Sequence, residues 1–281
     1  SPRRRETVKE QIGPVVHEYR TRDVALYHLG IGAGADDLDL VYEGVRGGLK
    51  VCPTFAVIPS FPAIIAALSR FEVQPGSILH GEEASFLEKP IPPRGKLSTT
   101  ARGPAVYDKG KAALLIVETE SADEAGEPLF RTRASVFCRG LGGFGGDPGP
   151  RVDARPVPAG RAPDFEVAGP PAESQAALYR LSGDLNPLHI DPAVASAAGF
   201  PRPILHGLCT FGFAGRAVVR GACGNDVGRL REFGCRFSAP VFPGETVTTR
   251  GWRMGGGLYL LQVSTGRGDV LSQAYACVRE E

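Results

Sequence analysis

The stretch Tyr179-Arg-Leu-Ser-Gly-Asp-Leu-Asn-Pro-Leu-His-Ile-Asp191 groups carboxylate, amide and imidazole side chains between an apolar run and an alanine-rich run. Asn186 followed by proline is typical of a helix N-cap with proline at the first helical position, which places His189 in the first helical turn. Gly183 permits backbone conformations that other residues resist, so we expect Asp184 in a turn. A carboxylate and an imidazole then face one small space, as needed to hold a water molecule and move its protons.

The pattern around this stretch also occurs near the start of the chain. Ala25-Leu-Tyr-x-Leu29 matches Ala177-Leu-Tyr-x-Leu181, an offset of 177 − 25 = 152. Three further pairs keep nearly the same offset: Phe86 with Phe237 (151), Pro90 with Pro240 (150) and Pro93 with Pro243 (150). Near-constant offsets in two separate stretches predict a duplicated unit.

Each copy is predicted to contain a helix, a long apolar helix and a run of antiparallel strands. In the first copy the predicted elements are a helix over 22–30, a short strand over 38–43, a long helix over 54–68 and strands within 78–139. Pro59 and Pro62 should break the long helix or delay its start. One long helix wrapped by a curved antiparallel sheet is the hotdog architecture. The predicted fold class is therefore α+β, a double hotdog of two tandem units.

Residues 141–163 are rich in Gly, Pro and Arg and show no hydrophobic period, so we interpret them as a linker. The predicted units are then residues 1–140 and residues 164–281. The glycine-rich start of the linker lacks the spaced glycines and the lysine of a phosphate-binding loop, which favours a flexible crossover.

The two copies differ at the polar positions. Carrying the 152-residue offset back from the C-terminal copy, Asp184, Asn186 and His189 fall on Gly32, Gly34 and Asp37. The N-terminal copy therefore lacks the polar set. We expect the C-terminal unit to do the chemistry and the N-terminal unit to shape a binding cleft at the joint.

The composition is that of a globular protein, with 281 residues, 42% of them hydrophobic and 22% charged. A net charge of +1 provides no global field to recruit nucleic acid, and no apolar run approaches the length of a membrane span.

The six cysteines form no CxxC pair, which favours small core residues in a reducing, intracellular compartment. The chain begins without methionine and its last residues, Arg-Glu-Glu, are not a peroxisomal address. We expect trimmed ends that carry no targeting information.

Together with Ile204-Leu-His-Gly-Leu-Cys-Thr210, the stretch at 179–191 resembles the hydratase 2 signature of MaoC-like enoyl-CoA hydratases. Four other segments resemble the hydratase region of peroxisomal multifunctional enzyme type 2: Ala25-Leu-Tyr-His-Leu-Gly-Ile-Gly32, Pro53-Thr-Phe-Ala-Val57, Leu79-His-Gly-Glu82 and Gly142-Gly-Phe-Gly-Gly146. The resemblance covers nearly the whole chain. It implies the double hotdog fold and the hydration of trans-2-enoyl-CoA to the (3R)-3-hydroxyacyl-CoA in fatty acid β-oxidation, a hydro-lyase reaction.

The resemblance also implies roles for residues of the central stretch. Asp184 and His189 together hold the water, Asp184 delivers the proton to C2, and Asn186 helps to fix the water. The CoA thioester is the substrate and no cofactor is implied; no cluster with metal-ligand spacing is visible in the sequence. Because the first copy keeps its apolar helix without the polar set, we expect the N-terminal unit to bind the acyl tail.

We expect a homodimer that acts on a small-molecule acyl-CoA, with no nucleic acid partner and no membrane insertion. This chain is also expected to occur as one part of a larger multifunctional chain. The expected compartment is the peroxisome in a eukaryote and the cytoplasm in a bacterium.

Hydration also needs a donor for the charge that develops on the thioester oxygen. We expect the backbone N–H of Gly207, at the start of the second long helix, to supply it. Tyr179 and Tyr27 are expected to line the cleft as core aromatics. Asp191 is either a helix cap or a substrate contact.

Glu43, Asp164 and Arg202 are weaker candidates. Structural roles are as plausible as catalytic roles for the two acids, and Arg202 either meets a CoA phosphate or is an ordinary surface arginine. The histidines at 17, 28, 80 and 206 are interpreted as structural.

Three alternative functions stay open. Dehydration of a 3-hydroxyacyl-ACP in fatty acid or polyketide synthesis is the same chemistry in reverse; the balanced charge slightly favours CoA over an acidic carrier protein. A hotdog thioesterase fits the fold but not the motif. A non-catalytic acyl-CoA-binding module is disfavoured by the complete set of Asp184, Asn186 and His189. Taken singly these residues could brace a turn or cap a helix, whereas their joint spacing favours function.

Overall fold

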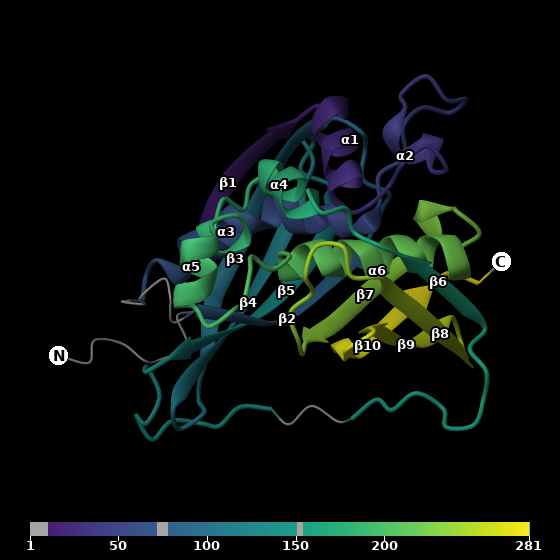
Figure 1. Ribbon diagram of the computed structural model, residues 1–281. Helices are drawn as coiled ribbons and strands as arrows, with labels where there is room; N and C mark the ends of the chain where they lie inside the picture. Colours follow the sequence, from purple (N-terminus) through teal and green to yellow (C-terminus); the bar gives the residue numbers. More distant parts are fainter. Residues whose placement is uncertain (1–10, 72–77, 151–153, 281) are drawn as a thin grey trace.

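Ten strands form one continuous antiparallel sheet in the computed structural model, which describes residues 11–71, 78–150 and 154–280 (Figure 1). The strands are β1 (Gln11–Tyr19), β2 (Ile78–Leu87), β3 (Gly95–Asp108), β4 (Ala112–Ala122), β5 (Pro128–Arg139), β6 (Phe165–Gly169), β7 (Leu230–Phe237), β8 (Val247–Gly255), β9 (Leu258–Thr265) and β10 (Gly268–Val278). Their order across the sheet is β1-β3-β4-β5-β2-β7-β10-β9-β8-β6.

The two halves of this sheet have the same topology. The first half runs β1-β3-β4-β5-β2, and the second, counted from its outer strand, runs β6-β8-β9-β10-β7. In two of the five corresponding pairs the strand starts also keep the spacing seen in the sequence, since 230 − 78 for β7 and β2 and 247 − 95 for β8 and β3 both give 152. The predicted fold class, an α+β double hotdog, is confirmed.

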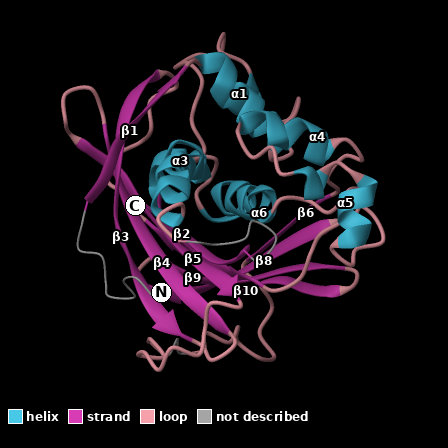
Figure 2. Ribbon diagram, turned by 90° about the vertical axis from the view of Figure 1, so that its left-hand side faces the viewer, coloured by secondary structure: helices cyan, strands magenta, loops and turns pink. Residues whose placement is uncertain are grey.

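The helices lie on one face of the sheet. They are α1 (Thr21–Gly30), α2 (Leu38–Val41), α3 (Val57–Leu68), α4 (Gln175–Tyr179), α5 (Pro192–Ala197) and α6 (Gly207–Ala222), with short 3₁₀ turns η1 (Pro53–Ala56), η3 (Arg180–Ser182), η4 (Pro187–His189) and η5 (Val227–Arg229). Figure 2 shows α3 and α6 side by side in the concave face, with α1, α4 and α5 outside them. Each half therefore has one long helix held by a curved sheet.

Helix α6 packs closely against the N-terminal half because it carries glycines on that side. A Cβ atom at Gly212 would lie 2.3 Å from the side chain of Ile31, and one at Gly215 would lie 2.3 Å from that of Thr54. The larger apolar cluster accordingly contains residues of both halves, among them Phe55 and Phe211. The pairing of β2 with β7, from Glu82 opposite Arg236 to Phe86 opposite Glu232, completes the joint.

Several predicted elements are confirmed, and others need correction. Helix α1 and the strands β2 to β5 lie where they were predicted. Residues 38–43 contain the short helix α2, because alternation over so few residues cannot separate a strand from a helical turn. The long helix begins at Val57 after a 3₁₀ turn and continues through Pro62 without a break. The outer strands β1 and β6 were not predicted.

The described parts of the segment between β5 and β6 lie on the side of the sheet opposite the helices (Figure 1). In its described part, 140–150 and 154–164, it forms neither helix nor strand. Its glycine-rich start is tied down by Asp108, whose carboxylate accepts the backbone N–H groups of Gly143 (2.8 Å) and Gly145 (2.7 Å). These bonds, together with the N–H of Gly110, lower the pKa of Asp108 to about 2. The glycine loop thus binds a carboxylate of its own chain.

Candidate active site

Asp184, His189 and His206 come together beside the start of α6. One side-chain oxygen or nitrogen atom from each lies within 4.8 Å of the others. Asp184 follows η3, His189 ends η4, and His206 directly precedes Gly207, the first residue of α6. The structure thus brings together the predicted Asp184 and His189, and it adds a histidine that the sequence analysis had interpreted as structural.

Local turn chemistry positions Asp184. Gly183 has φ +132°, a conformation that favours glycine, and the chain turns there between η3 and the motif loop. Asp184 Oδ1 accepts the backbone N–H of Asn186 (3.1 Å), and Asn186 Oδ1 accepts the N–H of Leu188 (3.1 Å). Asn186 is therefore the N-cap that the sequence predicted, although the turn it caps is 3₁₀ rather than α. Its side chain is exposed, and its amide nitrogen has no partner among the described hydrogen bonds.

A backbone carbonyl fixes the tautomer of His189. The Nδ1 atom lies 2.9 Å from the carbonyl oxygen of Ile204, which can only accept, so Nδ1 carries the proton and Nε2 is left as the acceptor. The side chain is only 8% exposed. Burial lowers the pKa of His189, which the hydrogen bond to Ile204 and the charge of Asp184 partly oppose. His189 is therefore a neutral base near pH 7.

His206 stacks on His189, with 3.8 Å between the ring centroids and 29° between the ring planes. Its Nε2 donates to the backbone carbonyl of Asp184 (3.0 Å), and its buried Nδ1 has no hydrogen-bond partner among the described residues. Burial and the neighbouring His189 lower the pKa of His206 to about 3. His206 thus stays neutral and supports both the loop of Asp184 and the ring of His189.

The cluster has ligand types that could hold a metal ion, but its geometry suits one poorly. Imidazoles bind a metal through lone pairs that lie in the ring plane. In two stacked rings these lone pairs run side by side instead of meeting at one point. One nitrogen of His189 and one of His206 also hold backbone carbonyls.

Gly207 presents a backbone donor beside this cluster. It is the first residue of α6, and its N–H has no partner among the described hydrogen bonds. Unpaired N–H groups at a helix start favour negative charge. The ring of Phe237 lies 3.2 Å from the place where a Cβ of residue 207 would be, so a side chain there would have to displace this ring slightly.

Tyr179 and Tyr27 are fully buried core aromatics, with ring centroids 6.1 Å apart. The ring of Tyr179 also lies 5.0 Å from that of His206. Burial raises the pKa of both tyrosines well above the usual value. Tyr179 therefore forms the floor beneath the cluster, and neither phenol is poised to ionise.

The remaining predicted acids do not belong to the cluster. Asp191 caps α5 by accepting the N–H of Ala193 (2.8 Å), and Asp164 binds Arg161 and the N–H of Arg253. Glu43 is exposed and makes no described polar contact.

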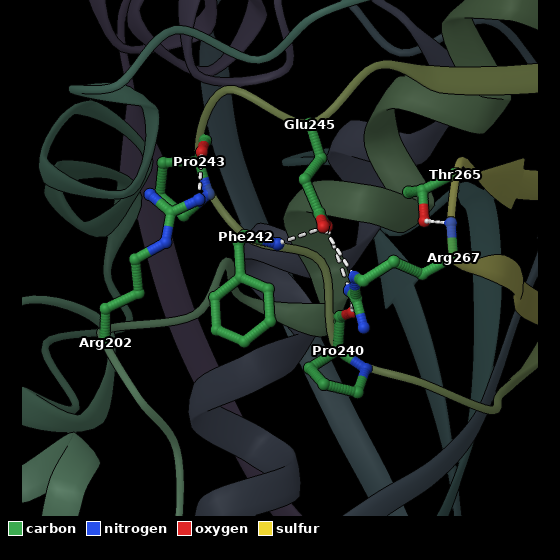
Figure 3. A network of polar contacts seen from close by, with 7 residues as sticks. All are labelled: Arg202, Pro240, Phe242, Pro243, Glu245, Thr265 and Arg267. Atoms are coloured by element: carbon green, nitrogen blue, oxygen red, sulfur yellow. Dashed lines mark hydrogen bonds and ion pairs between the residues drawn. The ribbon is translucent and has the colours of Figure 1, made fainter.

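Arg202 belongs to a polar network on the loop before β8 (Figure 3). It donates to the carbonyl of Pro243 (3.0 Å), and its guanidinium lies 5.2 Å from the centre of the Phe242 ring. Arg267 contacts the same ring at 4.9 Å and pairs with Glu245. Arg202 is thus held by the protein, and it is 48% exposed.

None of the helices in the described residues is both long enough and apolar enough to cross a membrane.

Fold and site together define a double-hotdog protein with one histidine–aspartate centre in its C-terminal half. Residues 17–140 match the MFE-2 hydratase 2 N-terminal domain, and residues 155–274 match the MaoC like domain. The chain is 39% identical to "Probable enoyl-CoA hydratase 2" of Dictyostelium discoideum, covering 98% of this chain and 96% of that protein.

Two solved structures agree with this comparison. A MaoC-like dehydratase from Phytophthora capsici superposes with a TM-score of 0.88 at 33% identity, over 98% of this chain and 97% of that one. The full-length peroxisomal multifunctional enzyme type 2 of Drosophila melanogaster gives 0.82 at 36% identity, over 96% of this chain and 48% of that one. The chain belongs to the MaoC-like family of hydratase 2 type, as the sequence motifs indicated.

Proposed function

We propose that the chain hydrates trans-2-enoyl-CoA to the (3R)-3-hydroxyacyl-CoA in fatty acid β-oxidation. The observation that carries this proposal is the position of the Asp184 carboxylate within 4.8 Å of the neutral His189, whose Nε2 is free to accept a proton. The unpaired N–H of Gly207 stands beside them. A water, a base and an oxyanion donor are what addition to an unsaturated thioester requires.

In the proposed reaction, Asp184 and His189 hold one water molecule, and Asn186 helps to orient it. The water oxygen adds to C3 as one proton of the water passes to the Asp184–His189 pair, and Asp184 delivers a proton to C2, so the pair ends in the protonation state in which it began. Charge that develops on the thioester oxygen is stabilised by the N–H of Gly207. Burial lowers the pKa of His189 and so keeps it neutral, and the stacked ring of His206 holds it in place.

The direct test is loss of enoyl absorbance with crotonyl-CoA, decenoyl-CoA and the corresponding ACP esters, followed by chiral analysis of the product. We expect turnover of the CoA esters and (3R) product. A (3S) product would contradict the proposed geometry, and turnover of ACP esters alone would favour the alternative below.

The alternative is dehydration of a 3-hydroxyacyl-ACP, which uses the same groups in the opposite direction. The similarity to a protein named a MaoC-like dehydratase supports this alternative. We propose further that the chemistry needs no resident metal or cofactor, since the stacked histidines suit hydrogen bonding better than ligation.

The division of labour between the halves is also a proposal. The first copy has Gly32 and Asp37 at the aligned catalytic positions, and Asp37 is engaged in an ion pair with Arg216 of α6 (2.7 Å). Its helix α3 is apolar along most of its length. We propose that residues 1–140 receive the acyl tail, residues 164–281 do the chemistry, and residues 141–163 link them.

The proposals for assembly and location are supported by the proteins to which this chain is similar. The chain corresponds to about half of the Drosophila multifunctional enzyme, and we propose that it acts on acyl-CoA alone or as one part of such a chain. Three apolar side chains around the site, Leu181, Leu185 and Ile190, are 57%, 59% and 43% exposed and offer a surface for a homodimer. We propose an intracellular location, peroxisomal in a eukaryote and cytoplasmic in a bacterium.

A further inference from the structure

One irregular segment of the C-terminal half contributes to several parts of the candidate site. Residues 203–206 form neither helix nor strand. The carbonyl of Ile204 fixes the tautomer of His189, and the ring of His206 stacks on that of His189. Gly207 follows directly, with its unpaired N–H at the start of α6. The geometry of the site therefore depends on what holds this segment in place.

A backbone hydrogen bond ties the segment to the loop between β7 and β8, residues 238–246. The N–H of Leu205 donates to the carbonyl of Val241 (2.8 Å). Both side chains are buried, at 3% and 2% exposed, so neither residue can move without disturbing the core. The position of the Val241 carbonyl thus sets the position of the segment.

Two arginines hold the loop on either side of Val241. Pro240 and Pro243 have no N–H with which to bond the neighbouring backbone. Their carbonyls are instead bound by guanidinium groups: Arg267 donates to Pro240 (2.6 Å), and Arg202 donates to Pro243 (3.0 Å). These two contacts fix the ends of the stretch that carries the Val241 carbonyl (Figure 3).

The loop also carries groups that orient the arginines. Glu245 binds Arg267 with both carboxylate oxygens, at 2.5 Å from Nε and 2.9 Å from Nη2, and it accepts the backbone N–H of Phe242 (2.9 Å). The Phe242 ring lies between the guanidinium groups of Arg202 and Arg267, 5.2 Å and 4.9 Å from its centre (Figure 3). A bidentate pair and a stacked ring leave little freedom to these side chains.

The aligned loop of the first copy is held by a neutral group. With the 150-residue offset of its prolines, Phe242 falls on Pro92 (242 − 150), whose carbonyl accepts the hydroxyl of Tyr19 (2.8 Å). A neutral contact therefore suffices to hold such a loop. Arg202 and Arg267 are 48% and 45% exposed, and partly exposed ion pairs add little stability. Their presence beside the catalytic cluster points to a role in the site.

We propose that Arg202 and Arg267 are positioning residues for the reaction. By holding the loop they fix the Val241 carbonyl, and hence the segment that orients His189 and presents Gly207. Neither arginine needs to touch the substrate. This inference rests on the proposed function and adds to it the residues that set the geometry of the reacting end.

The first test is Arg267→Met, which keeps an apolar stem beside Phe242 and removes the donors. With crotonyl-CoA, kcat should fall about tenfold, because small displacements of reacting groups cost up to about 100-fold. KM should stay within about twofold, since no substrate contact is removed. The matched control is Arg250→Met, which breaks a similar pair with Glu166 (2.6 Å) between β8 and β6 and should leave both constants within about twofold.

A truncated substrate separates positioning from a contact with CoA. Crotonyl-pantetheine keeps the thioester and lacks the nucleotide and its phosphates. If Arg267 positions the site, Arg267→Met lowers kcat by the same factor with both substrates. A variant with raised KM and unchanged kcat for crotonyl-CoA, and wild-type kinetics with crotonyl-pantetheine, would show that the arginine binds a phosphate and would overturn the inference.

A spectroscopic measurement tests the positioning without reference to turnover. The Nδ1 proton of His189, buried against the Ile204 carbonyl, should give a slowly exchanging NMR resonance that disappears in His189→Gln. This resonance should shift or broaden in Arg267→Met and stay unchanged in Arg250→Met. An unchanged resonance in a slowed Arg267→Met would contradict the proposed route through the loop, and wild-type kcat in that variant would contradict the role altogether.

A second variant covers the case in which Arg267→Met does not fold. Arg202→Met leaves the Arg267–Glu245 pair intact and removes the bond to Pro243, so kcat should fall about threefold, the scale of one hydrogen bond. The same resonance and the same two substrates then decide. A wild-type protein that does not hydrate crotonyl-CoA would contradict the proposed function, whereas the resonance of His189 would still test whether the arginines position it.

Discussion

The folded protein should lose stability as the pH falls below about 6.5, and much of that loss should come from His28. This side chain is 0% exposed and uses both ring nitrogens. Nδ1 donates to the carbonyl of Leu40 (2.5 Å), and Nε2 accepts the backbone N–H of Cys52 (3.0 Å). A proton on Nε2 would face another donor. Burial is the largest cause that lowers the pKa of His28, to about 4.

Acid lowers the free energy of unfolding because the unfolded chain takes up the proton at a higher pH than the folded chain does. Below pH 6.5 the unfolded chain protonates this histidine, whereas the folded chain does so only near pH 4, so acid favours unfolding across that window. The stabilisation is complete above pH 6.5 and is lost as the pH falls toward 4. At about 1.4 kcal/mol per pKa unit the full loss is about 3 kcal/mol, and roughly 2 kcal/mol of it is reached at pH 5. His206, whose pKa is about 3, acts in the same direction.

The assay is urea unfolding at pH 8 and pH 5 for the wild type and for His28→Gln. Glutamine offers one donor and one acceptor but does not titrate, so the variant should be less stable at pH 8 and lose about 2 kcal/mol less between the two pH values. The difference between the two losses of stability is the contribution of His28, because His206 and the carboxylates titrate in both proteins. Equal losses in the two proteins would refute the assignment, as would an NMR titration of the His28 ring with a midpoint near 6.5.

Three further predictions concern the division between the halves. Asp184→Asn and His189→Gln should each lower kcat by about 10²–10⁴-fold with an unchanged circular dichroism spectrum, since each removes a proton-transfer group. Asp37→Asn, at the aligned position of the first copy, should lower the melting temperature by weakening the ion pair with Arg216 but keep kcat; a loss as large as that of Asp184→Asn in a folded protein would contradict a single catalytic centre. Ala63→Leu, at a fully buried position of α3, should raise KM for decenoyl-CoA far more than for crotonyl-CoA, and equal changes would place the acyl tail elsewhere.

The fold could be predicted because duplication left a spacing that survives in the sequence. The 152-residue offset relates Tyr27 to Tyr179 and also the starts of two pairs of strands, β2 with β7 and β3 with β8. The strands β1 and β6 lie at the two outer edges of the sheet and have little internal alternation, so a period-2 search does not detect them. Their places are set by pairing with β3 and β8 rather than by their own sequences.

The candidate site was predicted where its residues are close in the sequence and missed where only the fold brings them together. Asp184, Asn186 and His189 share one loop, and turn chemistry links them directly. His206 lies on a different element and reaches His189 through stacking, which has no sequence signature. The available signal was its place directly before Gly207 at a helix start.

The continuous sheet formed through β2 and β7 has a consequence for how this protein can change over generations. In a symmetric dimer of single hotdog units, every substitution appears twice, once in each subunit. Here both halves are encoded in one chain, so a mutation in one of them leaves its counterpart untouched. Position 37 could therefore be recruited for an ion pair with Arg216 while position 189 remained histidine. With the division of labour proposed above, fusion frees the N-terminal half from selection for catalysis and keeps it as the partner against which the C-terminal half packs.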